Sequence, residues 1–257
     1  MRFRPCIDIH NGKVKQIVGG SLKDERDYAD ENFISELDAG HYAEKYKQDG
    51  LKGGHIIILN PAGSDYYKAD LEQAEAALAA YPGGLQIGGG ITSDNAVWFL
   101  DKGASHVIVT SFVFRDGTTD YANLEKISKI TGKERLVLDL SCRKKDGDYY
   151  IVTDRWQKFT REKVSRELLD RLSGYCDEFL VHAVDVEGKA SGIEQDLACL
   201  LGGWNKIPVT YAGGVGSFDD LRELRRAGRN HLDVTIGSAL SLFGGPMEYE
   251  RVIEECR

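Results

Sequence analysis

The stretch QIGGGI at residues 86–91 ends a short apolar run with three glycines, and its pattern returns as TYAGGVG at residues 210–216. Two further pairs repeat in the same order: VIVTS at 107–111 with VTIGS at 234–238, and CIDIH at 6–10 with VLDLS at 137–141. The second member of each pair follows the first by 124, 127 and 131 residues respectively, about half of the chain. Three motifs that each repeat after nearly the same number of residues predict a duplicated half-barrel of four βα units.

Short β-branched runs alternate with segments of helical period along the whole chain. The expected strands are residues 3–9, 55–59, 85–87, 106–109, 136–140, 178–182, 209–212 and 233–236. The expected helices are residues 41–47, 70–80, 93–102, 121–130, 166–175, 193–201 and 218–227, with Ser93 and Ser217 as N-caps. Nearly continuous apolar strands are typical of a parallel sheet buried on both faces.

The length favours closure of this sheet into a barrel. A chain of 257 residues suits one (βα)8 TIM barrel, and we expect a single domain over residues 1–257. An open dinucleotide-binding sheet is less suitable, because no G-x-G-x-x-G turn follows the first expected strand. The sequence therefore predicts an α/β protein built as one half-duplicated barrel.

Composition excludes several classes of function. The formal net charge of −8 and the pI near 5.3 argue against a nucleic-acid-binding surface. The five cysteines are scattered and include no C-x-x-C pair, so we expect reduced thiols, no metal site and a cytoplasmic protein. No stretch approaches 18 apolar residues and the start resembles no signal peptide, so we expect no membrane partner.

The repeated glycine turns predict two phosphate sites. On a barrel, the carboxyl ends of the strands form the face where active sites are built. Glycine lets backbone N–H groups approach an anion closely, and the hydroxyl residues that follow neighbouring strands add donors. One cradle comprises Gly89, Gly90, Thr110 and Ser111, and the other comprises Gly213, Gly214, Gly237 and Ser238. The competing interpretation is that these glycines only make tight βα turns.

Asp8 and Asp139 occupy equivalent places in the two halves, between the expected cradles. A carboxylate at the end of an apolar strand is partly desolvated, which raises its pKa and suits acid/base chemistry. Two carboxyl groups in unequal environments can take opposite roles, one protonated and one ionised. Alternatively, each aspartate caps a neighbouring turn. The repeat favours the catalytic interpretation.

Other candidate residues carry weaker signals. Trp156 follows a hairpin-like segment and could form an aromatic platform, although most tryptophans lie in the core. Arg143 could pair with an anion, although an arginine is solvated by default. Asp185 and Glu187 could line the site or solvate a loop. His55 and His106 lack metal-ligand spacing and are interpreted as structural.

With these residues, the chain resembles the phosphoribosylformimino-5-aminoimidazole carboxamide ribotide isomerase family of histidine biosynthesis, in its fungal and plant branch. The segments that carry the resemblance are residues 6–20, 85–91, 105–111, 136–144, 178–188, 211–221 and 232–245. Members of the family are half-duplicated barrels that bind a substrate with a phosphate at each end. The similarity extends over nearly the whole chain.

The resemblance implies a cofactor-free Amadori rearrangement of an aminoaldose to an aminoketose, with a small bis-phosphorylated molecule as the substrate and a monomer as the expected state. By position, Asp8 matches the general base of the family and Asp139 its general acid. Trp156 matches a tryptophan that stacks on the imidazole, and Gly20 falls among the phosphate-binding residues.

The chain departs from the bacterial pattern at two places. Ala183 follows His182 where bacterial members have a threonine that assists catalysis, so a nearby group such as Asp185 would have to substitute. LNPAG at residues 59–63 replaces an acidic run, and we assign nothing catalytic there.

Three other functions remain open at this point. The cyclase barrel of the same pathway shares both aspartates and both cradles, but its first strand leads into a different, lysine-containing segment. A bifunctional barrel that also isomerises phosphoribosylanthranilate would need the same acid/base pair. A non-catalytic ligand-binding barrel would not need intact aspartates at residues 8 and 139.

Overall fold

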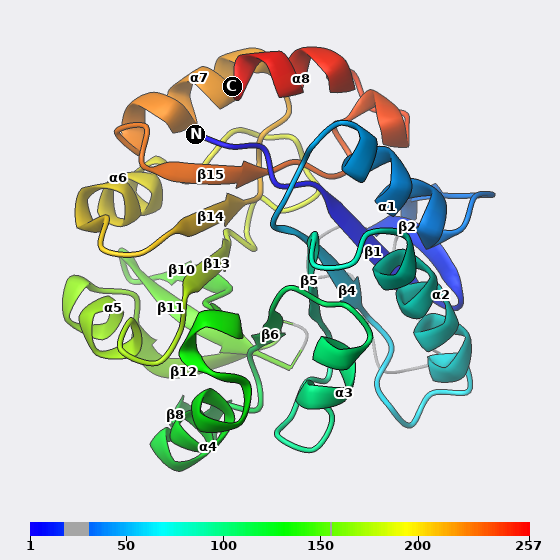
Figure 1. Ribbon diagram of the computed structural model, residues 1–257. Helices are drawn as coiled ribbons and strands as arrows, with labels where there is room; N and C mark the ends of the chain where they lie inside the picture. Colours follow the sequence, from blue (N-terminus) through cyan, green and yellow to red (C-terminus); the bar gives the residue numbers. More distant parts are fainter. Residues whose placement is uncertain (18–30, 155) are drawn as a thin grey trace.

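The computed structural model describes residues 1–17, 31–154 and 156–257. Within them, eight consecutive parallel strands form a sheet in which each strand pairs with the next, and Figure 1 looks into the ring that they make. These strands are β1 (Cys6–His10), β4 (Gly54–Ile58), β5 (Leu85–Gly88), β6 (Val107–Val109), β9 (Leu136–Asp139), β13 (Glu178–His182), β14 (Val209–Ala212) and β15 (Leu232–Thr235).

The chain just before β1 closes the sheet. Phe3 forms a parallel bridge with Val234 of β15. The N–H of Arg4 donates to the carbonyl of Val234 at 2.8 Å, and the N–H of Val234 donates to the carbonyl of Arg2 at 2.9 Å. The first and last parallel strands are thereby joined, which confirms the predicted (βα)8 barrel.

Helices surround this barrel (Figure 1). Those of the described chain are α1 (Ala39–Gln48), α2 (Tyr67–Ala80), α3 (Ala96–Asp101), α4 (Tyr121–Thr131), α5 (Arg166–Leu172), α6 (Gln195–Trp204), α7 (Phe218–Ala227) and α8 (Tyr249–Glu255), with short 3₁₀ turns at Lys133–Arg135 and Ser241–Phe243. Ser217 caps α7 as predicted, because its hydroxyl accepts the N–H of Asp220 at 3.2 Å. The prediction for Ser93 was wrong: the side chain of Asn95 accepts the N–H of Thr92 and holds a turn, so α3 begins only at Ala96.

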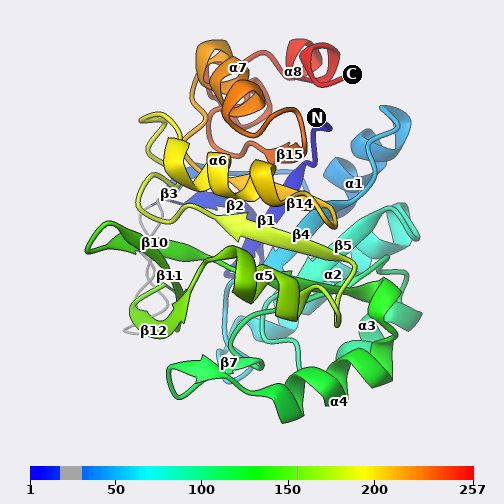
Figure 2. The ribbon, with the colours of Figure 1, turned by 90° about the vertical axis from the view of Figure 1, so that its left-hand side faces the viewer.

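Additional strands extend one end of the barrel (Figure 2). They are β2 (Lys13–Ile17) and β3 (Glu31–Ile34), which continue antiparallel from β1; a separate sheet of β10 (Cys142–Lys145), β11 (Asp148–Thr153) and β12 (Lys158–Lys163); and the small pair β7 (Phe114–Arg115) and β8 (Thr118–Thr119). Asp146 and Gly147 both have positive φ between β10 and β11, as a tight hairpin turn requires.

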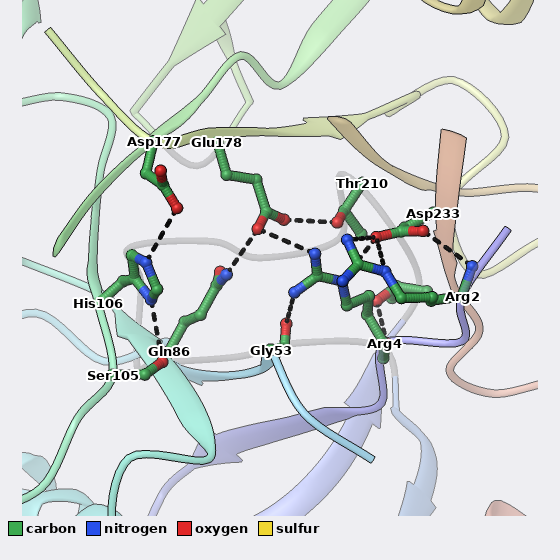
Figure 3. Close-up of polar contacts among 11 residues, drawn as sticks. Arg2, Arg4, Gly53, Gln86, Ser105, His106, Asp177, Glu178, Thr210 and Asp233 are labelled. Atoms are coloured by element: carbon green, nitrogen blue, oxygen red, sulfur yellow. Dashed lines mark hydrogen bonds and ion pairs between the residues drawn. The ribbon is translucent and has the colours of Figure 1, made fainter. Parts of the chain in front are cut away.

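A polar network fills the barrel interior at the amino ends of the strands (Figure 3). Arg4 reaches Asp233 at 2.9 Å and Glu178 at 3.3 Å. Glu178 also accepts hydrogen bonds from Gln86 at 3.0 Å and from Thr210 at 2.5 Å. Because β1, β5 and β13 are not neighbours in the sheet, these contacts cross the barrel and close its floor.

Apolar side chains form the rest of the core. The main cluster lies between the strands and the helices, with residues such as Ile7, Ile87 and Phe99 almost completely buried. A second cluster of Ile108, Val137 and Leu180 is separate from it and has Ile57 packed against it. Ile57 and Ile108 also line the cavity described below, so this second cluster supports the bottom of the cavity. No helix in the described part of the chain is long and apolar enough to cross a membrane.

Candidate active site

A cavity of about 950 Å³ opens at the carboxyl ends of the barrel strands. This is the size and place expected of a small-molecule site in such a barrel. The predicted site residues that line it are Asp8, Gly89, Gly90, Thr110, Ser111, Asp139, Trp156 and Gly237. Within the described ranges, those that do not line it are Arg143, Asp185, Gly213, Gly214 and Ser238. Gly20 lies outside the described residues.

The first glycine cradle opens onto this cavity. Gly89 has φ +101°, and a Cβ atom there would lie 2.1 Å from the carbonyl oxygen of Ile58. Gly90 has φ +68°, and a Cβ atom on it would meet nothing within 4 Å. Close backbone packing therefore requires a glycine at the first position, whereas the second leaves an open approach to the backbone. With Thr110 and Ser111 beside it, this wall offers backbone and hydroxyl donors to an anion.

The second cradle is covered. The N–H of Gly192 donates to the carbonyl of Gly214 at 3.0 Å. A Cβ atom on Gly213 would lie 2.8 Å from the carbonyl oxygen of Ala183, and one on Gly237 would lie 2.2 Å from the side-chain oxygen of Gln16. In this conformation the segment between β13 and α6 packs directly onto the β14 turn. The structure thus brings the first cradle and Gly237 of the second to the cavity, and it leaves Gly213 and Gly214 beneath this segment.

Asp8 lies on β1 in the cavity wall, where the side-chain nitrogen of Gln16 is 3.4 Å from its carboxylate. Burial raises the pKa of Asp8 to about 7, the negative charge of Glu187 adds to the rise, and His182 opposes it. A carboxyl group with a pKa near neutrality can both take and return a proton at physiological pH.

Asp139 ends β9, and its pKa is shifted in the direction opposite to that of Asp8. One of its oxygens accepts the N–H and the hydroxyl of Ser141 at 2.8 and 2.7 Å, and the other accepts the hydroxyl of Thr110 at 3.3 Å. The Nδ1 atom of His182 lies 3.5 Å from the first oxygen. Burial by itself would raise the pKa of Asp139, but the charge of His182 and these hydrogen bonds outweigh it and lower the pKa. The two aspartates therefore occupy unequal environments.

His182 completes this side of the cavity. Burial by itself would lower the pKa of its imidazole, but the charge of Asp139 and their hydrogen bond outweigh it and raise the pKa to about 9. The ring centroid of Trp156 lies 5.7 Å from that of His182, with 41° between the planes. Trp156 reaches this position with a left-handed backbone, φ +67°, so the loop between β11 and β12 presents an aromatic wall to the cavity.

The segment after His182 places one of its two candidate carboxylates in the cavity. Asp185 accepts from Arg143 at 2.8 Å and from the N–H of Lys144 at 2.9 Å, so in this structure it fastens β10. Glu187 lines the cavity, and its buried Oε2 atom has no hydrogen-bond partner within the described residues. Burial raises the pKa of Glu187. The sequence could not separate these two residues, because both follow the same strand.

Among the described residues, neither a group of metal ligands nor a reactive thiol is found near the site. In residues 1–17, 31–154 and 156–257, no group of three or more His, Cys, Asp or Glu side chains could hold a metal ion. Cys6 lies beside Asp8, but burial raises the pKa of its thiol well above the ordinary value. A neutral buried thiol is a poor nucleophile. The described residues that line this cavity include carboxyl and imidazole groups, which are suited to acid/base chemistry.

Residues 2–245 match the family model described as "Histidine biosynthesis protein". The chain belongs to the histidine biosynthesis protein family. The match covers the barrel from the strand-closing residues before β1 to the turn after β15. It confirms the family that the sequence resembles.

Three relatives within this family carry one name, 1-(5-phosphoribosyl)-5-((5-phosphoribosylamino)methylideneamino) imidazole-4-carboxamide isomerase. The chloroplastic protein of Medicago truncatula is 56% identical over 259 residues, which cover 98% of this chain and 81% of that protein. The protein of Yarrowia lipolytica is 47% identical, covering 95% of this chain and 93% of its own. The protein of Saccharomyces cerevisiae is 40% identical, with the same coverage of 95% and 93%.

Proposed function

We propose that this chain is the aldose–ketose isomerase that its relatives' names describe, acting on the phosphoribosylformimino aminoimidazole carboxamide ribonucleotide of histidine biosynthesis. The observation that carries the proposal is the pair of Asp8 and Asp139 in the lining of one cavity, each with different hydrogen-bond partners. An Amadori rearrangement needs one group to protonate the ribose ring oxygen and another to remove the proton from C2. Such a pair supplies both roles.

In this proposal, Asp8 is the general base and Asp139 is the general acid, as the family resemblance implies. The open cradle of Gly89, Gly90, Thr110 and Ser111 would bind one phosphate, and Trp156 would stack on the imidazole. Gly213, Gly214, Gly237 and Ser238 would bind the second phosphate once the segment after His182 moves off the β14 turn, with Gly20 also contributing. Arg143 and Asp185 would approach substrate only with such a movement.

We propose one barrel domain over residues 1–257, a monomer, no nucleic-acid partner and a location in the cytoplasm. The described cysteines are all free, which agrees with a reducing compartment. Because the Medicago relative is named chloroplastic, imaging of the tagged full-length protein in its own cells is the test of location.

A coupled assay on the purified chain tests the reaction. The protein receives the aminoaldose substrate, excess synthase that consumes the ketose product, and no added metal. We expect turnover that depends on the chain. Binding of the substrate without turnover would contradict the isomerase proposal, and ammonia-dependent cyclisation by this chain would then identify the cyclase of the same pathway instead.

The activity should fall as the solution becomes acidic through pH 7. A general base works only when ionised, and the pKa of Asp8 is raised to about 7, so lowering the pH below that value removes the active form. We expect kcat/KM to lose about tenfold for each unit of pH well below this pKa. Measurement of kcat/KM at pH values from 5 to 8 follows this loss of activity. Constant kcat/KM down to pH 5 would show that no group with the ionisation of Asp8 acts as the base.

A further inference from the structure

The first cradle by itself offers only neutral donors to a phosphate. The hydroxyl of Thr110 donates to Asp139 at 3.3 Å, and a hydroxyl has a single proton, so Ser111 and the backbone remain as donors. The carboxyl groups among the described residues that line the same cavity are Asp8, Asp139, Asp154 and Glu187. Because ionised carboxyl groups repel a phosphate dianion, binding of a phosphate here calls for a cation in the cavity wall.

Arg115 supplies such a cation. Among the described residues that line the cavity, the lysine and arginine side chains are those of Lys158 and Arg115. Lys158 pairs with Asp154 at 2.9 Å. Arg115 is exposed and makes no ion pair within the described chain. Its guanidinium is therefore available to an anion, and its planar fork can donate two parallel hydrogen bonds to phosphate oxygens.

The backbone after β6 turns Arg115 back toward the first cradle. The N–H groups of Val113 and Phe114 both donate to the carbonyl of Thr110, at 3.0 and 2.9 Å. The chain then enters β7, where Arg115 pairs with Thr118 of β8. Because this turn begins within the cradle, Arg115 follows Thr110 by only five positions and lines the same cavity.

Glu162 of β12 holds the β7–β8 hairpin in place. One oxygen of Glu162 accepts the hydroxyl of Thr118 at 3.0 Å and the N–H and hydroxyl of Thr119 at 2.8 and 2.9 Å. Burial by itself would raise the pKa of Glu162, but these hydrogen bonds outweigh it and lower the pKa. The N–H of Arg161 also donates to the carbonyl of Gly117 at 2.7 Å, and Figure 2 shows the hairpin at the same end of the barrel as β12. The strand that pairs with Arg115 is thus fixed by an ionised carboxylate.

We propose that Arg115 binds a phosphate group of the substrate together with the first cradle, and that Glu162 is the positioning residue of Arg115. This inference rests on the proposed isomerase function and adds a positive charge to the neutral donors of the cradle. The guanidinium contacts the phosphate and takes no part in the proton transfers. Its loss should therefore weaken substrate binding and leave the chemical step unchanged.

The test compares Arg115→Gln, Arg115→Lys and Arg161→Gln in the full-length protein. Arg161→Gln is the matched control, because Arg161 is exposed, does not line the cavity and contacts the hairpin through its backbone. We expect Arg115→Gln to raise KM about tenfold, the lower end of what a hydrogen bond between charged groups contributes, with kcat within about twofold of the wild type. Arg115→Lys keeps the charge but loses the fork, so KM should rise only about threefold. Added salt should raise the KM of the wild type more than that of Arg115→Gln.

Glu162→Gln tests the positioning role. An amide oxygen is a weaker acceptor than a carboxylate, so we expect KM to rise about threefold while kcat is unchanged. The double variant Arg115→Gln/Glu162→Gln should have the KM of Arg115→Gln alone, because the two residues act through one contact. Effects on KM that multiply in the double variant would show that Glu162 acts independently of Arg115.

A KM of Arg115→Gln within about twofold of the wild type would overturn the inference. An equal rise of KM in Arg161→Gln would also overturn it, since any positive charge near the cavity would then have the same effect. Isothermal titration calorimetry with the substrate compares dissociation constants without requiring turnover. Wild-type binding without turnover would contradict the proposed function, while weaker binding by Arg115→Gln would still support the phosphate contact. Absence of binding by the wild type would overturn both.

Discussion

Asp8→Asn is expected to lower kcat by about 10³-fold, within the range that general acid–base groups contribute. The amide has nearly the same shape as the carboxyl group but cannot accept the proton of C2. The hydrogen bond from the side-chain nitrogen of Gln16 to the carboxylate of Asp8 is long, at 3.4 Å. Loss of the charge of Asp8 should therefore leave the fold intact. The coupled isomerase assay measures kcat, and isothermal titration calorimetry with the substrate measures binding, which should stay within about threefold.

Asp101→Asn is the matched control for Asp8→Asn. Asp101 is exposed at the end of α3 and does not line the cavity. Its replacement by asparagine removes one negative charge, as Asp8→Asn does. Its kcat should equal that of the wild type. If Asp8→Asn kept more than a tenth of the wild-type kcat, Asp8 would not be the general base, and Glu187 would be the next carboxylate of the cavity to replace.

The largest loss of stability is expected for Arg4→Met, about 3–5 kcal/mol of the free energy of unfolding. The side chain of Arg4 is 7% exposed and pairs with Asp233 and Glu178, which are equally buried (Figure 3). Removing the guanidinium leaves the buried carboxylate of Glu178 without this cation and leaves Asp233 paired with the exposed Arg2. Urea unfolding followed by circular dichroism measures the change, and the remaining folded protein should keep its kcat, because the network lies at the opposite end of the strands from the cavity.

Two variants separate burial from charge in this network. Arg2 also pairs with Asp233, at 2.8 Å, but its side chain is 67% exposed, so Arg2→Met should cost only about 0–1 kcal/mol. Adding Glu178→Gln to Arg4→Met removes one uncompensated charge and should restore part of the stability. Equal losses from Arg2→Met and Arg4→Met would mean that the buried cation does not hold the barrel floor together.

The fold could be predicted from the sequence because its signals are local and repeated. The strands expected at residues 178–182 and 209–212 coincide with β13 and β14, and Ser217 caps α7 as its side-chain chemistry dictates. Less regular features were missed. α8 and the antiparallel strands β2 and β3 carry no strong periodic pattern, and Asn95 diverted the start of α3 by bonding to the backbone of its own turn.

The sequence by itself determined that this chain is a (βα)8 barrel and where its aspartates and glycines stand along the strands, because periodicity and spacing are properties of the linear chain. Only the tertiary structure decided the pKa values of those groups and the contacts that they make. The pKa of Asp139 is lowered because His182, 43 positions away in sequence, lies against it, and Glu187 lines the cavity whereas Asp185 pairs with Arg143. Desolvation and charge pairing depend on distances between strands, and these distances arise only when the barrel closes.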